Sequence, residues 1–127
     1  MVSVILIDED KRILLQHRTD DAPKYPGMWG FFGGGIEENE TPLEAAKREC
    51  LEEIEYKLKN PKLILKKNTA KGDFFMFIEK YDSSQKLVLH EGQDMKWFKI
   101  EEIKQIKTAQ FVKEAIEEIA PLINSQT

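Results

Sequence analysis

Residues 29–56 read WGFFGGGIEENETPLEAAKRECLEEIEY, a glycine-rich loop that leads into an acidic segment. Within it Thr41 is a preferred N-cap residue, Pro42 suits the first helical position, and Glu44 stands where a capping box needs it. This signature predicts a helix that begins at residue 41. An aromatic strand therefore leads, through glycines, into a helix with a defined start.

The predicted helix has an apolar face and an acidic face. Its apolar face consists of Leu43, Ala46, Cys50 and Ile54, with Leu51 at the margin. Helical spacing leaves Glu49, Glu52 and Glu53 together on the adjoining face, within about one turn. Crowded carboxylates repel one another, so either a cation lies between them or they form an acidic face in contact only with solvent.

A divalent cation is the natural occupant of such a face. Hard cations prefer oxygen ligands, and Mg²⁺ bound by a few carboxylates keeps water molecules that a phosphate can replace. The spacing of the three glutamates therefore predicts a site for Mg²⁺ or Mn²⁺ next to a phosphate-containing substrate.

The same stretch resembles the motif of the Nudix hydrolases, the MutT-type pyrophosphohydrolases: G-x5-E-x7-R-E-U-x-E-E-x-G-U, with U a bulky aliphatic residue. Its glycine and charged positions from the first glycine to the last glutamate are filled by Gly34, Glu40, Arg48, Glu49, Glu52 and Glu53. An accidental match at all of them has a probability on the order of 10⁻⁴ or less. The chain departs from the motif at packing and helix-ending positions, where it has Cys50, Glu55 and Tyr56; Phe32 also stands where many relatives have proline.

The resemblance implies an α+β fold, the Nudix-type α/β/α sandwich with a mixed β-sheet between helices. It also implies metal-assisted hydrolysis of a phosphoric anhydride, in which the cation stabilises developing charge and activates water. By the motif, Glu49, Glu52 and Glu53 bind the metal together with the carbonyl oxygen of Gly33.

Further residues acquire roles from the same resemblance. Glu40 and Arg48 are expected to form a structural ion pair between loop and helix, with substrate contact as the alternative. Gly34 and Gly35 are expected to bind substrate, because a backbone without β-carbons can approach a diphosphate closely. Read alone, the glycine run has a flexible turn as its less favoured alternative.

The catalytic candidates are Glu49, Glu52 and Glu91. One of them is expected to serve as general base, unless a metal makes a base unnecessary. Glu91 precedes the predicted strand at residues 95–100, where many relatives carry another catalytic or metal-binding glutamate on a loop. A solvated loop charge is the alternative for Glu91.

Substrate recognition is less well marked. Arg18 ends a predicted strand and, by family analogy, contacts the nucleotide or its phosphates. Phe31 is a candidate for stacking on a base, although aromatic residues on strands are commonly core residues. The other stacking candidates are Phe75, Phe77 and Phe98. Relatives that act on dinucleoside polyphosphates or ADP-ribose often carry a tyrosine or proline shortly beyond the motif, and residues 71–74 contain neither. This favours nucleoside triphosphates, oxidised ones included.

The flanking sequence fits one domain over residues 1–127. Strands are expected at residues 2–7, 12–17, 58–67, 74–81 and 95–100, and a second helix at 111–123 that buries Phe111, Ala115, Ile119 and Leu122. The strands at 2–7 and 12–17 are expected to form a hairpin. Residues 124–127 are expected to form a frayed tail.

Composition excludes several classes of protein. A net charge of −4 argues against a nucleic-acid polymer as the partner. The single cysteine, Cys50, excludes an intrachain disulfide framework, and its place in the helix favours a small buried hydrophobe. The first residues predict a strand and neither a signal peptide nor a membrane span, so we expect a cytoplasmic protein.

The sequence therefore predicts a Mg²⁺-dependent hydrolase of a small-molecule nucleotide, a nucleoside diphosphate linked to another group. Two alternatives are a non-catalytic nucleotide sensor and an RNA-decapping hydrolase. The complete glutamate set argues against the first, and the acidic charge against the second. The oligomeric state is left open, with a homodimer as one candidate.

Overall fold

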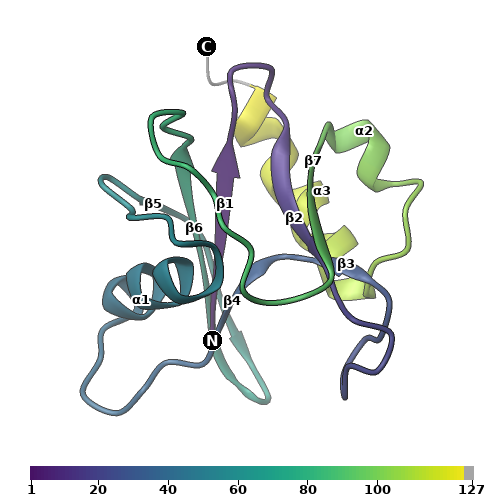
Figure 1. Ribbon diagram of the computed structural model, residues 1–127. Helices are drawn as coiled ribbons and strands as arrows, with labels where there is room; N and C mark the ends of the chain where they lie inside the picture. The colour runs from purple at the N-terminus through teal and green to yellow at the C-terminus, as the bar shows by residue number, and fades with distance from the viewer. Residues whose placement is uncertain (125–127) are drawn as a thin grey trace.

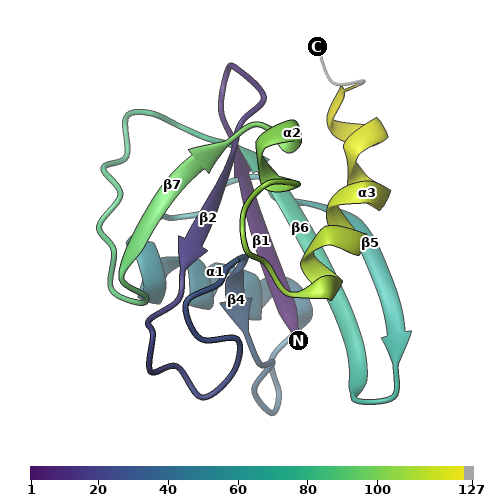
Figure 2. The same cartoon turned by 90° about the vertical axis from the view of Figure 1, so that its right-hand side faces the viewer.

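The computed structural model describes residues 1–124, which form a mixed β-sheet with a long helix on each face (Figure 1). In chain order the elements are β1 (Val2–Ile7), β2 (Ile13–His17), β3 (Trp29–Gly30), β4 (Phe32–Gly34), α1 (Pro42–Ile54), β5 (Lys62–Thr69), β6 (Gly72–Lys80), β7 (Asp94–Phe98), α2 (Ile100–Ile103) and α3 (Gln110–Asn124). The predicted α+β sandwich is confirmed. Figure 2 shows α3 on the near side of the sheet and α1 behind it.

The sheet forks next to its central strand. β1 pairs in parallel with β6 along its whole length, whereas its other edge is shared by two antiparallel strands. Ile7 pairs with Ile13 of β2, but the opposite end of β1, from Val2 to Val4, pairs with β4. β2 continues away from β1 and pairs with β3 and β7. We call the divergence of β1 and β2 the fork.

Period-two alternation along the central strands builds a separate core on each face of the sheet. On β1, Val2, Val4 and Leu6 point toward α1, and Ile5 and Ile7 toward α3. β6 follows the same rule, because Phe77 packs on the α1 side while Met76 and Ile78 pack on the α3 side. The sheet is thus buried on both faces, as its apolar strands predict.

Helix α1 begins as its sequence predicts. Thr41 accepts a hydrogen bond from the Glu44 backbone N–H at 3.1 Å, and Glu44 Oε1 accepts one from the Thr41 N–H at 2.9 Å. Pro42 is the first helical residue. Cys50 is fully buried, and burial raises the pKa of its thiol to about 12, so it behaves as a hydrophobe.

Both helices bury most of the predicted residues, namely Ala46, Cys50, Ile54, Ala115 and Ile119, but not all of them. On α1 the exposed side chains include Leu43 (39%) and Leu51 (54%), whereas Ala45 and Glu53 are buried. On α3, Phe111 and Leu122 are also exposed, and the buried residues are Val112, Ala115, Ile116, Ile119 and Ile123. The predictions for Leu43, Phe111 and Leu122 are therefore wrong. On α3 the buried face is rotated by one residue at each end, so that Val112 and Ile123 are buried where Phe111 and Leu122 were expected.

Element boundaries differ from the predictions by a few residues. β5 begins at Lys62 and not at residue 58, because Leu58 is buried in a loop that packs on the α1 core. β7 ends at Phe98, and α2 follows it. Asn124 ends α3 and does not belong to a tail, while residues 125–127 of the predicted tail lie outside the described residues. None of the helices within residues 1–124 is long and apolar enough to span a membrane.

Candidate active site

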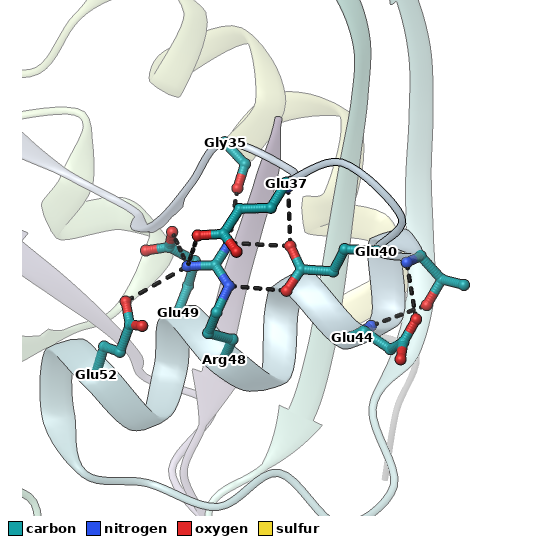
Figure 3. A network of polar contacts seen from close by, with 8 residues as sticks. Gly35, Glu37, Glu40, Glu44, Arg48, Glu49 and Glu52 are labelled. Atoms are coloured by element: carbon teal, nitrogen blue, oxygen red, sulfur yellow. Dashed lines mark hydrogen bonds and ion pairs between the residues drawn. The ribbon is translucent and has the colours of Figure 1, made fainter.

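Arg48 lies at the centre of a group of carboxylates between α1 and the glycine-rich loop (Figure 3). Its Nε is 2.7 Å from Glu40 Oε2, and its Nη2 is 3.0 Å from Glu40 Oε1. Nη2 also donates to the carbonyl oxygen of Gly35 at 3.0 Å. The hydrogen bonds from Arg48 hold the pKa of Glu40 below its ordinary value. The structure thus brings the predicted Glu40–Arg48 pair together as a link between loop and helix.

The same guanidinium group contacts two of the predicted metal ligands. Arg48 Nη1 is 2.9 Å from Glu49 Oε1 and 3.4 Å from Glu52 Oε2. The Glu52 side chain is 60% exposed, and that of Glu49 is 14% exposed. Within residues 1–124, no three His, Cys, Asp or Glu side chains form a ready-made metal-ligand group. Arg48 occupies the position between carboxylates that a cation would otherwise fill.

Glu53 faces the sheet and not the acidic face on which its spacing placed it. Only 3% of it is exposed, and its Oε2 and Oε1 accept the backbone N–H of Gly33 at 3.1 and 3.3 Å. Burial, a hydrogen bond with Glu49 and the charge of Glu91 raise the pKa of Glu53 to about 10, against the opposing effect of the Gly33 N–H. A carboxylate in this environment lacks a counter-charge.

The glycines of the loop have different surroundings. Gly33 has φ +146°, and a β-carbon there would lie 2.1 Å from the Val2 carbonyl oxygen. A β-carbon on Gly34 would lie 2.6 Å from Glu49 Oε1, whereas one on Gly35 would meet no atom within 4 Å. Sequence reasoning attributed these glycines to phosphate approach. In the structure, Gly33 is already required by its contact with backbone atoms, whereas a β-carbon on Gly34 would displace only the flexible end of the Glu49 side chain.

The loop between β6 and β7 brings Glu91 to the same place. The His90 backbone N–H donates to the Glu53 carbonyl oxygen at 2.8 Å, and the Val88 N–H donates to the Ile54 carbonyl oxygen at 3.0 Å. These bonds attach the loop to the last turn of α1. Glu91, which follows directly, is exposed and its charge acts on Glu53. Two carboxylates that are far apart in the sequence therefore approach each other here.

A cleft extends from these carboxylates along the fork. Its lining includes Ser3, Gln16, Arg18, Gly33 and Glu91, and its far wall is formed by Tyr25, Trp29, Phe31, Ala109, Phe111 and Val112. Of the predicted stacking candidates, only Phe31 lines the cleft. Phe77 and Phe98 are buried in the two cores, and Phe75 packs against the α1 core. The cleft is therefore acidic at one end and aromatic at the other.

Sequence reasoning missed Gln16. Gln16 is 2% exposed and lines the cleft. Its Nε2 has no hydrogen-bond partner within the described residues. Gly30 lies opposite it on β3. The available signal was a polar residue inside the otherwise apolar run of β2, since a buried amide donor needs a partner. Arg18, one step further along the same face, donates from Nε to the Lys24 carbonyl oxygen at 2.8 Å.

The donor set at the acidic end fits a hard divalent cation. Glu49, Glu52 and Glu53 offer only oxygen ligands, and the buried carboxylate of Glu53 has no compensating charge of its own. Arg48 shows that positive charge is accommodated at this position.

Comparison with known proteins agrees with this geometry. The NUDIX domain family model matches residues 1–119. The nucleoside triphosphatase NudI of Escherichia fergusonii is 29% identical over 120 residues, which cover 79% of this chain and 82% of the relative. Among solved structures, a MutT protein from work on Aliivibrio salmonicida and Vibrio cholerae has a TM-score of 0.82 at 21% identity and covers 95% of both chains.

A second solved structure is the NUDIX domain of Shewanella oneidensis NrtR in complex with ADP ribose. It has a TM-score of 0.72 at 20% identity, covering 96% of this chain and 86% of that domain. The motif from Gly34 to Glu53, the fold around it and the family match over residues 1–119 lead to one conclusion. This chain belongs to the Nudix hydrolase family.

Proposed function

We propose that this protein is a Mg²⁺- or Mn²⁺-dependent pyrophosphohydrolase whose substrate is a nucleoside diphosphate linked to another group, most readily a nucleoside triphosphate, oxidised triphosphates included. The observation that carries the proposal is the buried carboxylate of Glu53, which accepts a hydrogen bond from the backbone N–H of Gly33, a residue that lines the cleft together with Glu91. The similarity to a nucleoside triphosphatase, NudI, supports a triphosphate substrate.

In this proposal Glu49, Glu52, Glu53 and the carbonyl oxygen of Gly33 hold the cation. When bound, the cation supplies charge neutralisation for the phosphate oxygens and lowers the pKa of a bound water molecule. To hold a cation, Glu53 would have to act as a carboxylate and release its proton to solvent. Arg48 keeps its two bonds to Glu40 and so continues to join loop and helix.

In this proposal the other residues of the cleft accept a proton, bind the phosphates or contact the base. Glu91, Glu49 and Glu52 are the candidates for accepting the proton of the attacking water, and Glu91 is the one that approaches the cleft from a separate loop. Arg18 lies where it can neutralise phosphate charge, and Gly34 and Gly35 present backbone to the diphosphate. Phe31 and the aromatic wall contact the base.

The proposal also includes a cell compartment, the binding partner and the oligomeric state. Cys50 is a buried free thiol, which suits a reducing compartment such as the cytoplasm. A small nucleotide is the proposed partner, and an acidic surface disfavours both a nucleic-acid polymer and an anionic membrane surface. A homodimer stays an open alternative to a monomer.

A nucleotide screen tests the proposal. The protein is incubated with ordinary and oxidised nucleoside triphosphates, ADP-ribose and dinucleoside polyphosphates, with Mg²⁺, with Mn²⁺ and with excess chelator. We expect cation-dependent release of pyrophosphate or phosphate, fastest with triphosphates. Full activity after exhaustive chelation would contradict the metal assignment. Binding without turnover across the panel would support the alternative of a nucleotide sensor.

A further inference from the structure

The loop that carries Glu91 is attached on both sides of that residue. Before it, the backbone N–H of His90 donates to the Glu53 carbonyl oxygen at 2.8 Å. After it, Gln93 donates from its backbone N–H to the His17 carbonyl oxygen at 2.8 Å and from Nε2 to the Arg18 carbonyl oxygen at 2.7 Å. Glu91 therefore lies between an anchor on α1 and an anchor at the end of β2.

A side-chain contact strengthens the first anchor. His90 Nε2 contacts Glu55 Oε2, joining the loop to the residue that ends α1. Glu55 is the C-cap and has left-handed backbone angles, φ 55° and ψ 31°. Glycine is preferred in this conformation, and it is the residue that the Nudix motif has at this position. Glutamate therefore replaces glycine at a position where its side chain reaches the Glu91 loop.

Stability alone does not account for this replacement. A non-glycine residue in the left-handed region is strained relative to glycine. A side-chain contact as exposed as this one, with His90 and Glu55 51% and 49% exposed, stabilises a fold only slightly. The two small effects oppose each other, so the pair has little net effect on folding. The contact between the two side chains still restricts the position of the loop that carries Glu91.

We propose that the Glu55–His90 pair is a positioning device that holds Glu91 at the cleft, an inference that rests on the proposed role of Glu91 at the active site. A peptide unit held by one hydrogen bond can still rotate about that bond. The side-chain contact of His90 provides a second fixed point, which restricts the direction in which Glu91 leaves the chain. Neither Glu55 nor His90 contacts substrate in this account.

The backbone that follows Glu91 is packed tightly against β2. It therefore cannot keep Glu91 in place by adjusting if the contact with α1 is lost. Gly92 has φ +88°, and a β-carbon there would lie 2.8 Å from both Gln16 Cγ and the His17 carbonyl oxygen. The segment therefore turns tightly against β2. With one side fixed by packing, the orientation of Glu91 depends on the other side, where the Glu55–His90 pair lies.

The test uses Glu55→Gly, Glu55→Gln, His90→Ala and the Glu55→Gly/His90→Ala double variant. We expect Glu55→Gly to keep or raise the melting temperature, because it relieves the left-handed strain, yet to lower kcat about threefold to tenfold with little change in KM. Amide hydrogen exchange at residues 90 and 91 should accelerate by a similar factor. Glu55→Gln should restore both, since its amide oxygen can accept from His90, and the double variant should be no worse than either single variant.

A matched control is Glu118→Gln, which removes the Lys67–Glu118 pair on β5 and α3, whose side chains are 42% and 43% exposed. It should leave kcat and the exchange at residues 90 and 91 unchanged. Wild-type kcat and wild-type exchange in Glu55→Gly would overturn the proposal.

The experiment separates this proposal from the proposed function. If Glu91→Gln turns over at the wild-type rate, Glu91 has no role at the site and the positioning proposal falls, while hydrolysis itself stands. If the wild-type protein hydrolyses no nucleotide, the proposed function fails. Hydrogen exchange then still shows whether the pair fixes the loop, and unchanged exchange in Glu55→Gly overturns the positioning proposal there as well.

Discussion

Glu53 is a buried carboxyl group for which the fold provides no cationic partner within residues 1–124. The residue is 3% exposed, and its partners are a backbone N–H, another glutamate and the charge of Glu91. A buried carboxylate without a cationic partner retains its proton, because ionisation in a low-dielectric site is unfavourable. The proposed cation would replace that proton.

The first prediction concerns the pH dependence of stability without metal. Folding raises the pKa of Glu53 from its ordinary value of 4.5 to about 10. Between these values the native state holds a proton that the unfolded state has released, so stability is fully present below pH 4.5 and falls as the pH rises toward 10. Urea unfolding in chelator should show a decrease on the order of a few kcal/mol from pH 5 to pH 9.

Glu53→Gln should abolish this decrease, because the amide is neutral at every pH. A wild-type slope that persists in the variant would mean that another group is responsible.

Arg48 provides the second prediction at this scale. Arg48→Met keeps the aliphatic stem but leaves Glu40, Glu49 and Glu52 without their common partner. The urea midpoint at pH 7 in chelator should fall clearly further than for Arg12→Met, which removes a more exposed pair with Asp8. Equal midpoints for the two variants would show that Arg48 does not link loop and helix.

At the scale of elements, short-range sequence signals predicted the start of a helix but not all of its packing. The start of α1 was predictable because Thr41, Pro42 and Glu44 satisfy the first-turn donors among themselves. The buried face was predictable only in part, because which residues a helix buries depends on the surface that it meets. Ala46, Cys50 and Ile54 are buried as predicted, but Glu53 is buried as well. Glu53 is buried since the loop places the Gly33 N–H against it, a contact between residues 20 positions apart.

The glycine-rich loop gives the third prediction, a series in which the same added β-carbon meets three surroundings. Gly33→Ala should destabilise by about 3 kcal/mol or more, because a backbone carbonyl cannot move away and φ is positive. Gly34→Ala should cost less than about 1 kcal/mol, since the flexible Glu49 side chain can move, but that movement should weaken Mn²⁺ binding about tenfold or more. Gly35→Ala is the control, with an open surrounding and little effect on stability.

Urea unfolding and Mn²⁺ titration measure the two effects separately. Wild-type Mn²⁺ affinity in Gly34→Ala would remove the reason for placing Glu49 among the ligands.

At the scale of the whole molecule, the order of elements and the motif predicted the family and the sandwich, since both follow from short-range pattern. The cleft was not predictable, because it arises where β1 exchanges β2 for β4 as its partner and the sheet forks. Gln16 and Arg18 line the cleft together with Glu91, which the β6–β7 loop brings from far along the chain. Arg18 and Glu91 were proposed by family analogy, and Gln16 had no motif to indicate it.

The most direct test of the central claim is a paired measurement on Glu53→Gln. With chelator at pH 8, the variant should be more stable than the wild type, by on the order of 1–3 kcal/mol, because the wild-type protein must take up a proton at Glu53 when it folds and the amide needs none. With Mg²⁺ and the best substrate of the nucleotide screen, its turnover should fall by at least about 10²-fold, because a metal ligand is lost. A large loss of stability with turnover close to the wild-type value would contradict the account, since Glu53 would then hold the fold and take no part in the chemistry.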